Sequence, residues 1–239
     1  MKYLFSLFLV WSIHLSLFSQ KILLEKDISH AYKNLKGPNT KSFGQVYFGY
    51  GLIIDPSQGS ATEIKMPNSW LGTIGYRHKY KVSGFYSFGF EAGMRLSQYH
   101  IKQTDAKVFP NAINHDKEKI RLCSGSIGLY NRFNFGRRGN IIGKFIDLGG
   151  YAAYNYNTVH YTKDDISGDA TPGADVYAKK RVTKNSGLDY IEPFDFGLYG
   201  RAGINKFAIR ANFRLTDLFK AGYHWAELPA LTIGVELSI

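Results

Sequence analysis

The chain has 239 residues, of which 44% are hydrophobic and 15% aromatic, and its 30 Lys and Arg against 19 Asp and Glu give a formal net charge of +11. This composition excludes a disordered chain, and the single cysteine excludes an internal disulfide and argues against a cysteine-based zinc site. Glycine is frequent at 25 residues and proline scarce at 7, which is typical of a strand-rich protein with bends and close backbone approaches.

The first 20 residues have the pattern of a secretory signal peptide. A short basic start precedes an apolar stretch that ends at the small residue Ser19. A membrane-anchor helix is the alternative, but His14 and several serines interrupt the stretch, and about 20 apolar residues are needed to span a bilayer. We therefore expect Sec-type export, with residues 1–20 as the signal and cleavage after Ser19 or Gln20.

Residues 21–42 form a separate segment ahead of the strands. Leu24, Ile28, Tyr32 and Leu35 lie near helical spacing among charges, which permits a short amphipathic helix that ends before Gly37. No later stretch resembles a transmembrane helix, so the mature chain can span a membrane only as a barrel. We expect residues 21–42 to be periplasmic and residues 43–239 to form the barrel.

Eight segments alternate with a period of two, as strands do. They lie at 43–54, 69–80, 85–99, 119–135, 141–156, 188–204, 207–216 and 231–239. Most of them reach the roughly 9–11 residues that a tilted strand needs to cross a bilayer.

Short and long connections alternate along the chain. Turns at 81–84, 136–140 and 205–206 are short, whereas the polar connections at 55–68, 100–118, 157–187 and 217–228 are long. Transmembrane barrels have this asymmetry, with short periplasmic turns and long outer loops. The pattern predicts an all-β, eight-stranded antiparallel transmembrane barrel in the outer membrane.

One face of each segment is bulky and apolar, and the other mixes small residues with charges of both signs. A soluble, lipocalin-like barrel would turn the apolar face inward. The cations in mid-strand are nearly all arginine, which suits buried carboxylates through its planar fork, so we expect the polar face to fill a narrow lumen. The predicted structural network of the lumen comprises Arg77, Glu91, Arg95, Arg132, Asp147, Asp195, Arg201, Arg210, Arg214 and Glu236.

Aromatic residues gather near the ends of the segments. Those at the long-loop ends are Tyr99, Tyr154, Tyr156 and Tyr190. They predict interface girdles, although strands favour aromatic residues in any case.

The signal ending Leu17-Phe18-Ser19-Gln20, the strand pattern and the closing residues 228–239 resemble the porT-like group of small outer-membrane β-barrel proteins of the Bacteroidota. The resemblance covers roughly residues 43–239 as a pattern. Members of this group include parts of the type IX secretion and gliding machinery and many barrels of unknown role, so the resemblance implies an envelope barrel for which a place in that machinery is one expectation. The chain departs from many outer-membrane barrels in ending on Ile239, which is not aromatic.

The sequence shows no pattern for a cofactor, a metal or a catalytic site. The histidines are scattered without paired ligand spacing, and no nucleophile elbow is present. The net charge does not indicate nucleic acid, since no basic stripe with interleaved aromatic residues occurs. The longest loop holds a candidate contact for lipopolysaccharide in Lys179, Lys180, Arg181 and Lys184, with a solvated loop as the alternative.

We expect a non-enzymatic envelope component, a scaffold or accessory subunit that contacts outer-membrane lipid, lipopolysaccharide and other envelope proteins. A surface binding or adhesion barrel is the first alternative. A lipid A-modifying enzyme, similar to a deacylase, is the second.

Overall fold

The computed structural model describes residues 37–55, 62–136, 139–165 and 180–239. The predicted signal peptide at 1–20 and the possible helix near 24–35 lie outside the described residues. Within the described ranges there are two short 3-10 turns, Met66–Asn68 and Ala221–Tyr223, and no helix that could cross a membrane.

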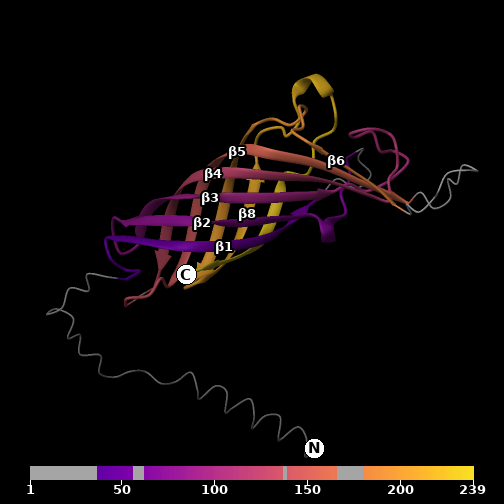
Figure 1. Ribbon diagram of the computed structural model, residues 1–239. Helices are drawn as coiled ribbons and strands as arrows, with labels where there is room; N and C mark the ends of the chain where they lie inside the picture. Colours follow the sequence, from indigo (N-terminus) through magenta and orange to yellow (C-terminus); the bar gives the residue numbers. More distant parts are fainter. Residues whose placement is uncertain (1–36, 56–61, 137–138, 166–179) are drawn as a thin grey trace, which may run out of the picture. The chain divides into compact units, whose positions relative to one another are not determined.

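Eight strands close into an antiparallel barrel, which confirms the predicted fold class. They are β1 (Ser42–Ile54), β2 (Trp70–Lys81), β3 (Tyr86–His100), β4 (Lys117–Phe135), β5 (Lys144–Asp165), β7 (Phe194–Ile204), β8 (Phe207–Arg214) and β9 (Leu231–Ser238). Sequential strands pair around the ring, with β5 next to β7, and the pairing of β1 with β9 closes it (Figure 1). The short connections at one end and the long ones at the other follow the expected alternation.

The seam between β1 and β9 places two glycines opposite each other. Gly51 faces Gly234, and a Cβ added to Gly234 would lie 2.3 Å from the Tyr50 carbonyl oxygen and 2.4 Å from the Gly51 Cα. These distances are too short for any side chain, so the close approach requires glycine. Ile239 extends the seam, because its N–H donates to the Val46 carbonyl at 2.8 Å.

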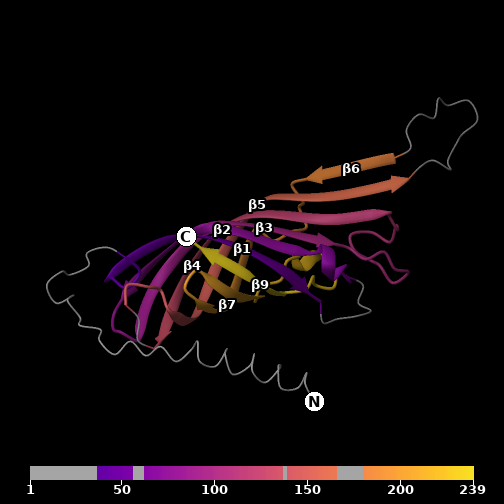
Figure 2. The same cartoon turned by 90° about the horizontal axis from the view of Figure 1, so that it is seen from below.

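The connection predicted at 157–187 contains strand structure that the sequence analysis missed. β5 continues to Asp165 and pairs with a ninth strand, β6 (Lys180–Ser186), which lies outside the closed ring. Figure 2 shows this hairpin standing out from the barrel wall. Both faces of these segments are polar, so the apolar-polar alternation that marks a strand is absent there. The long polar connection expected at 157–187 therefore has strand structure at both of its ends.

The segment predicted at 188–204 is a strand only from Phe194 onward. Pro193 precedes β7, and it has no N–H to donate to a ladder. Residues before it turn toward the loop between β8 and β9 instead. Ile191 forms an isolated bridge with Phe219, and the Glu192 N–H donates to the Leu218 carbonyl at 2.8 Å.

Candidate functional site in the barrel interior and at its long-loop end

The barrel exposes its apolar residues and buries its charged ones. Leu129 is 71% exposed and Val235 65%, whereas Arg77 is 1% exposed and Asp147 is fully buried. Large apolar side chains are exposed on all eight barrel strands: Val46, Phe48, Ile74, Phe88, Met94, Ile127, Leu129, Ile146, Leu148, Phe196, Leu198, Ile209, Phe213, Ile233 and Val235. We call this outward surface the apolar band. The arrangement is the reverse of a soluble barrel, in which the apolar face is inside.

Seven of the ten predicted lumen residues meet in one connected network of ion pairs. Its members are Arg77, Glu91, Arg132, Asp147, Arg201, Arg210 and Glu236, and we call it the interior network. Strand alternation points each of these side chains inward, and barrel closure brings together residues from β2, β3, β4, β5, β7, β8 and β9. Four arginines face three carboxylates, so the fully ionised network carries a charge of 4 − 3 = +1.

Arg201 lies at the centre of the interior network. Its guanidinium is 2.5 Å from the Asp147 carboxylate, 3.2 Å from Glu91 and 3.3 Å from Glu236. Asp147 also accepts two hydrogen bonds from Arg132, at 2.7 and 2.8 Å. A single arginine thus joins all three carboxylates, and the planar donor fork makes this sharing possible.

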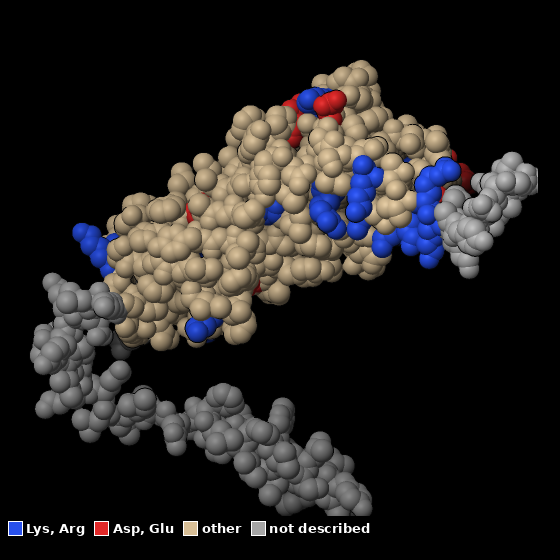
Figure 3. Space-filling view, in the orientation of Figure 1, with Lys and Arg blue, Asp and Glu red and all other residues tan. Residues whose placement is uncertain are grey.

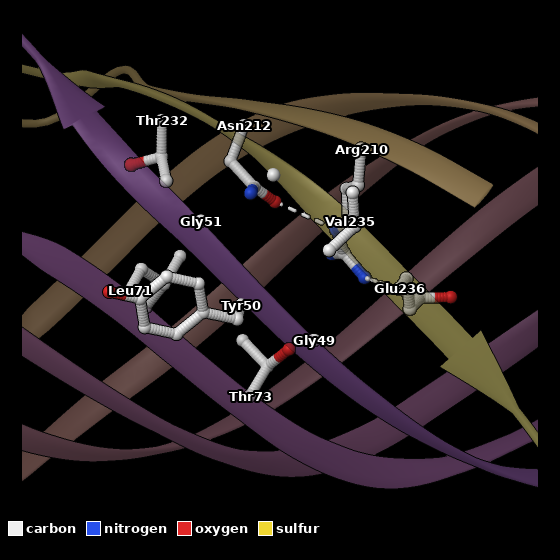
Figure 4. Close-up of a pocket in the computed structure, with 11 residues that line it drawn as sticks. Gly49, Tyr50, Gly51, Leu71, Thr73, Arg210, Asn212, Thr232, Val235 and Glu236 are labelled. Carbon is white, nitrogen blue, oxygen red and sulfur yellow. Dashed lines mark hydrogen bonds and ion pairs between the residues drawn. The ribbon is translucent and has the colours of Figure 1, made fainter. Parts of the chain in front are cut away.

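The other two carboxylates are shared by a second pair of arginines. Arg77 lies 3.3 Å from Glu91 and 2.6 Å from Glu236, and Arg210 lies 2.7 and 3.3 Å from the same two groups. Figure 4 shows Arg210 between Asn212 and Glu236 at the β1–β9 wall, where a cavity of about 20 Å³ remains. That volume is of the order of one water molecule.

Aromatic rings fill the space around the arginines. The Arg77 guanidinium carbon lies 4.4 Å from the centre of the Tyr47 ring, Arg210 lies 3.9 Å from Tyr199, and Arg132 lies 3.9 Å from Phe145. These cation–π contacts add attraction for cations that are shielded from water. Side chains therefore fill this level of the barrel.

The remaining three predicted residues, Arg95, Asp195 and Arg214, lie nearer the long-loop end and do not join the interior network. Arg95 stacks 4.0 Å from the centre of the Tyr151 ring, and the hydroxyl of the same tyrosine donates to Asp195 at 3.5 Å. Arg214 pairs with Glu227 at 3.2 Å and donates to the Leu228 carbonyl at 2.7 Å. These three residues line a second cavity of about 20 Å³.

The long loops form a hydrophobic cluster at their end of the barrel, which sequence reasoning did not predict. Phe109 is fully buried, with its ring centre 4.4 Å from Phe219, 4.8 Å from Trp225 and 5.8 Å from Tyr190. We call the cluster the loop cap; its buried members are Ile53, Ile64, Tyr99, Ile101, Phe109, Ile120, Leu122, Ile191, Leu218, Phe219 and Leu228. The available signal was the occurrence of large apolar residues inside loops that are otherwise polar.

The loop cap also changes the interpretation of two predicted girdle residues. Tyr99 is buried in the cap and Tyr190 packs against it, whereas Tyr154 and Tyr156 are exposed on the outward face. The girdle assignment was wrong for Tyr99 and Tyr190, because the loops fold over these strand ends and enclose them.

A buried carboxylate ties the loop between β3 and β4 to the strands beneath it. Glu118 lies 2.6 Å from the Lys107 ammonium, 2.8 Å from His160 Nε2 and 2.9 Å from the Gln103 amide nitrogen. Burial alone would raise the pKa of Glu118, but the hydrogen bonds from His160, Lys107 and Gln103 outweigh it and hold the pKa below its ordinary value. Glu118 is therefore ionised at neutral pH and stabilises the loop.

Comparison with known proteins adds no family to this geometry: no protein-family model matches the chain, and no curated protein matches it. Within the described ranges, no three His, Cys, Asp or Glu side chains converge as metal ligands. The seven charged groups of the interior network pair with one another, whereas Arg95 and Asp195 at the second cavity form no described ion pair.

Proposed function

We propose that the chain spans the outer membrane of a Gram-negative bacterium as a filled barrel and serves as a non-enzymatic structural or accessory component of an envelope complex. The apolar band is the observation that carries the proposal. Soluble monomers rarely expose contiguous apolar patches of more than a few hundred Å², while this band includes side chains from all eight barrel strands. Acyl chains of a bilayer would cover it.

The filled interior supports a structural role over a conduit. The interior network occupies one level of the barrel, and the loop cap is a second packed layer at the long-loop end. A solute that passed through the barrel would have to open both the interior network and the loop cap. An association with the type IX secretion or gliding machinery is the form of accessory role that the porT-like resemblance favours.

A charged substitution in the apolar band separates a membrane barrel from a soluble one. Leu129→Arg should cost about 2–4 kcal/mol in a bilayer, because arginine on the lipid face of a barrel is destabilising near the midplane. In water the same change at a residue 71% exposed would be nearly neutral. Urea titrations of the protein folded in phosphatidylcholine vesicles measure the difference, with Leu129→Ala as the matched control for lost side-chain volume. Equal stability of the Arg and Ala variants would refute the membrane assignment.

The accessory role is tested by recovery of a tagged chain from outer membranes in mild detergent, followed by mass spectrometry. Stoichiometric secretion or gliding subunits would support the proposal, and deletion of residues 21–42 would then test whether that segment holds the complex together. Recovery of the chain alone would refute the accessory role. Loop-ligand screens and lipid A mass measurements would then test the adhesion and deacylase alternatives.

A further inference from the structure

A cluster of cations lies on the outward face of the sheet, beyond the apolar band at the long-loop end. The register pairs Lys117 in β4 with Lys163 in β5, and it places Tyr161 between Lys119 and Lys184 of β6. Cross-strand partners share a face, as do residues two apart on a strand. Lys117, Lys119, Arg121, Lys163 and Lys184 therefore form one cation patch. Figure 3 shows lysine and arginine gathered in this region, beside a broad surface with almost no charge.

The cation patch lacks acidic partners on its own face. The residues that pair across β3, β4, β5 and β6, from Gln98 to Lys184, include no Asp or Glu on this face. The next acid along β5 is Asp165, at the end of the strand, where it pairs with Lys180. The contacts within the patch are to neutral groups: Arg121 donates to the side-chain amide oxygen of Gln98 at 3.1 Å, and Lys119 lies 4.8 Å from the centre of the Tyr161 ring. In the described part of the chain, no ion pair joins the five cations to a carboxylate.

These cations repel one another across the strands. Like charges directly opposite, as at Lys117 and Lys163, destabilise a sheet. Burial, followed by the charges of Arg121, Lys117 and Lys184, lowers the pKa of Lys119. Burial, followed by Lys117 and Lys119, lowers the pKa of His100 on the neighbouring strand to about 4. A bound anion would relieve this repulsion.

Two acids next to the patch, Glu118 in β4 and Asp164 in β5, point to the other face and already have partners. Glu118 lies between Lys117 and Lys119 and pairs with Lys107, while Asp164 lies 2.8 Å from His115 Nδ1. Strand alternation thus sorts the charges into a satisfied inner set and an unsatisfied outer set. Among the described residues, no carboxylate pairs with the outer set, so its cations are available to an anion from outside the chain.

We propose that the cation patch binds the phosphate groups of an anionic glycolipid headgroup of the lipopolysaccharide class. This inference rests on the proposed membrane-spanning function, since it takes the apolar band to be covered by acyl chains. Arg121 lies one pleat repeat, about 7 Å, beyond Cys123, which pairs with Leu96 of β3 on the side toward the apolar band. A lipid whose chains lie along the band therefore brings its headgroup phosphates to the patch, and Lys and Arg are the residues that bind phosphate.

The test uses the full chain folded in neutral phosphatidylcholine vesicles and two probes, bisphosphorylated lipid A and the same lipid after dephosphorylation. Binding of the phosphorylated form should be about tenfold tighter or more and should weaken as salt is added. A variant with Lys117→Gln, Lys119→Gln and Lys184→Gln should lose that preference. A matched variant with Lys41→Gln, Lys144→Gln and Lys206→Gln, exposed cations at the short-turn end, should keep it.

Several results would overturn the inference. One is equal affinity for the two probes, and another is an unchanged preference for the phosphorylated probe in the patch variant. A third is binding of phosphatidylglycerol as tight as that of phosphorylated lipid A, which would show that the patch does not select a glycolipid. The patch variant should fold, because it removes repulsion, and Arg121→Gln with Lys163→Gln repeats the test from the same patch. Failure of the unmodified chain to enter vesicles at all would instead refute the proposed membrane function.

Discussion

Asp147→Asn is the sharpest test of the interior network. The Asp147 side chain is fully buried and accepts hydrogen bonds from Arg132 at 2.7 and 2.8 Å and from Arg201 at 2.5 and 2.8 Å. Asparagine keeps the shape of the side chain but removes its charge, and its amide nitrogen cannot accept a hydrogen bond. The charge of the network rises from +1 to +2. Arg132 loses its carboxylate partner, and Arg201 keeps only Glu91 and Glu236.

The expected cost is about 3–5 kcal/mol, which is the range for breaking one partner of a buried ion pair. Every tenfold change in the folding equilibrium corresponds to about 1.4 kcal/mol, so the folded-to-unfolded ratio should fall by a factor of roughly 10² to 4 × 10³. The ion pair itself need not stabilise the fold by this amount, since most of the loss comes from leaving Arg132 buried without a carboxylate and from the uncompensated positive charge beside Arg201.

Denaturant titration of the folded protein in detergent micelles, followed by tryptophan fluorescence, measures this cost. Asp217→Asn, at an exposed acid in the loop after β8, is the matched control and should change stability by less than about 0.5 kcal/mol. If Asp147→Asn changes the unfolding free energy no more than Asp217→Asn does, the buried arginines do not need the Asp147 carboxylate, and the interior network does not stabilise the barrel.

Three further predictions concern other parts of the barrel. Arg210→Leu should cost about 3 kcal/mol because Arg210 pairs with two carboxylates, whereas Arg95→Leu should cost less because Arg95 stays outside the interior network; equal melting temperatures would contradict this order. Gly234→Ala should destabilise the seam by about 1–3 kcal/mol, while Gly125→Ala, where an added Cβ meets nothing within 4 Å, should be tolerated, and denaturant midpoints compare the two. The pKa of Glu118 is lower in the folded state than in the unfolded state. Its contribution to the folding free energy should therefore be fully present above its unfolded pKa of about 4.5 and be lost as the pH falls further. Protease cleavage of the loop at 101–116 should rise below that pH in the native chain, and Glu118→Gln should show the raised cleavage already at neutral pH.

The sequence allowed prediction of the strands and faces but not of the contacts across the barrel. Alternation assigns Glu91 and Arg201 to the inward face from local pattern alone. Their contact at 3.2 Å joins residues 110 positions apart, and it depends on strand order, closure and register together. The local pattern of the interior network also holds for Arg95, Asp195 and Arg214. These three residues lie nearer the long-loop ends of their strands, so they do not reach the interior network.

The loop cap and β6 were missed for opposite reasons. Phe109 lies in a loop whose neighbours are polar, so no period reveals that it will be buried by Phe219 and Trp225 from a loop more than 100 residues later. β6 has too little apolar character on either face to show a period, and only its pairing with β5 makes it a strand. Both features are set by contacts that are distant in sequence.

The order of the packed layers constrains how this barrel could act. From the short-turn end, a ligand entering the barrel would first meet the interior network, then a cavity of about 20 Å³, and then the loop cap. Opening the network separates buried charges at a cost of several kcal/mol per ion, and opening the cap exposes Phe109 and its aromatic neighbours to water. The two layers consist of different groups, so no single ligand contact lowers both barriers together. Binding at the outward face and on the loop surface requires neither layer to open, which is why we propose lipid and protein partners and not a transported solute.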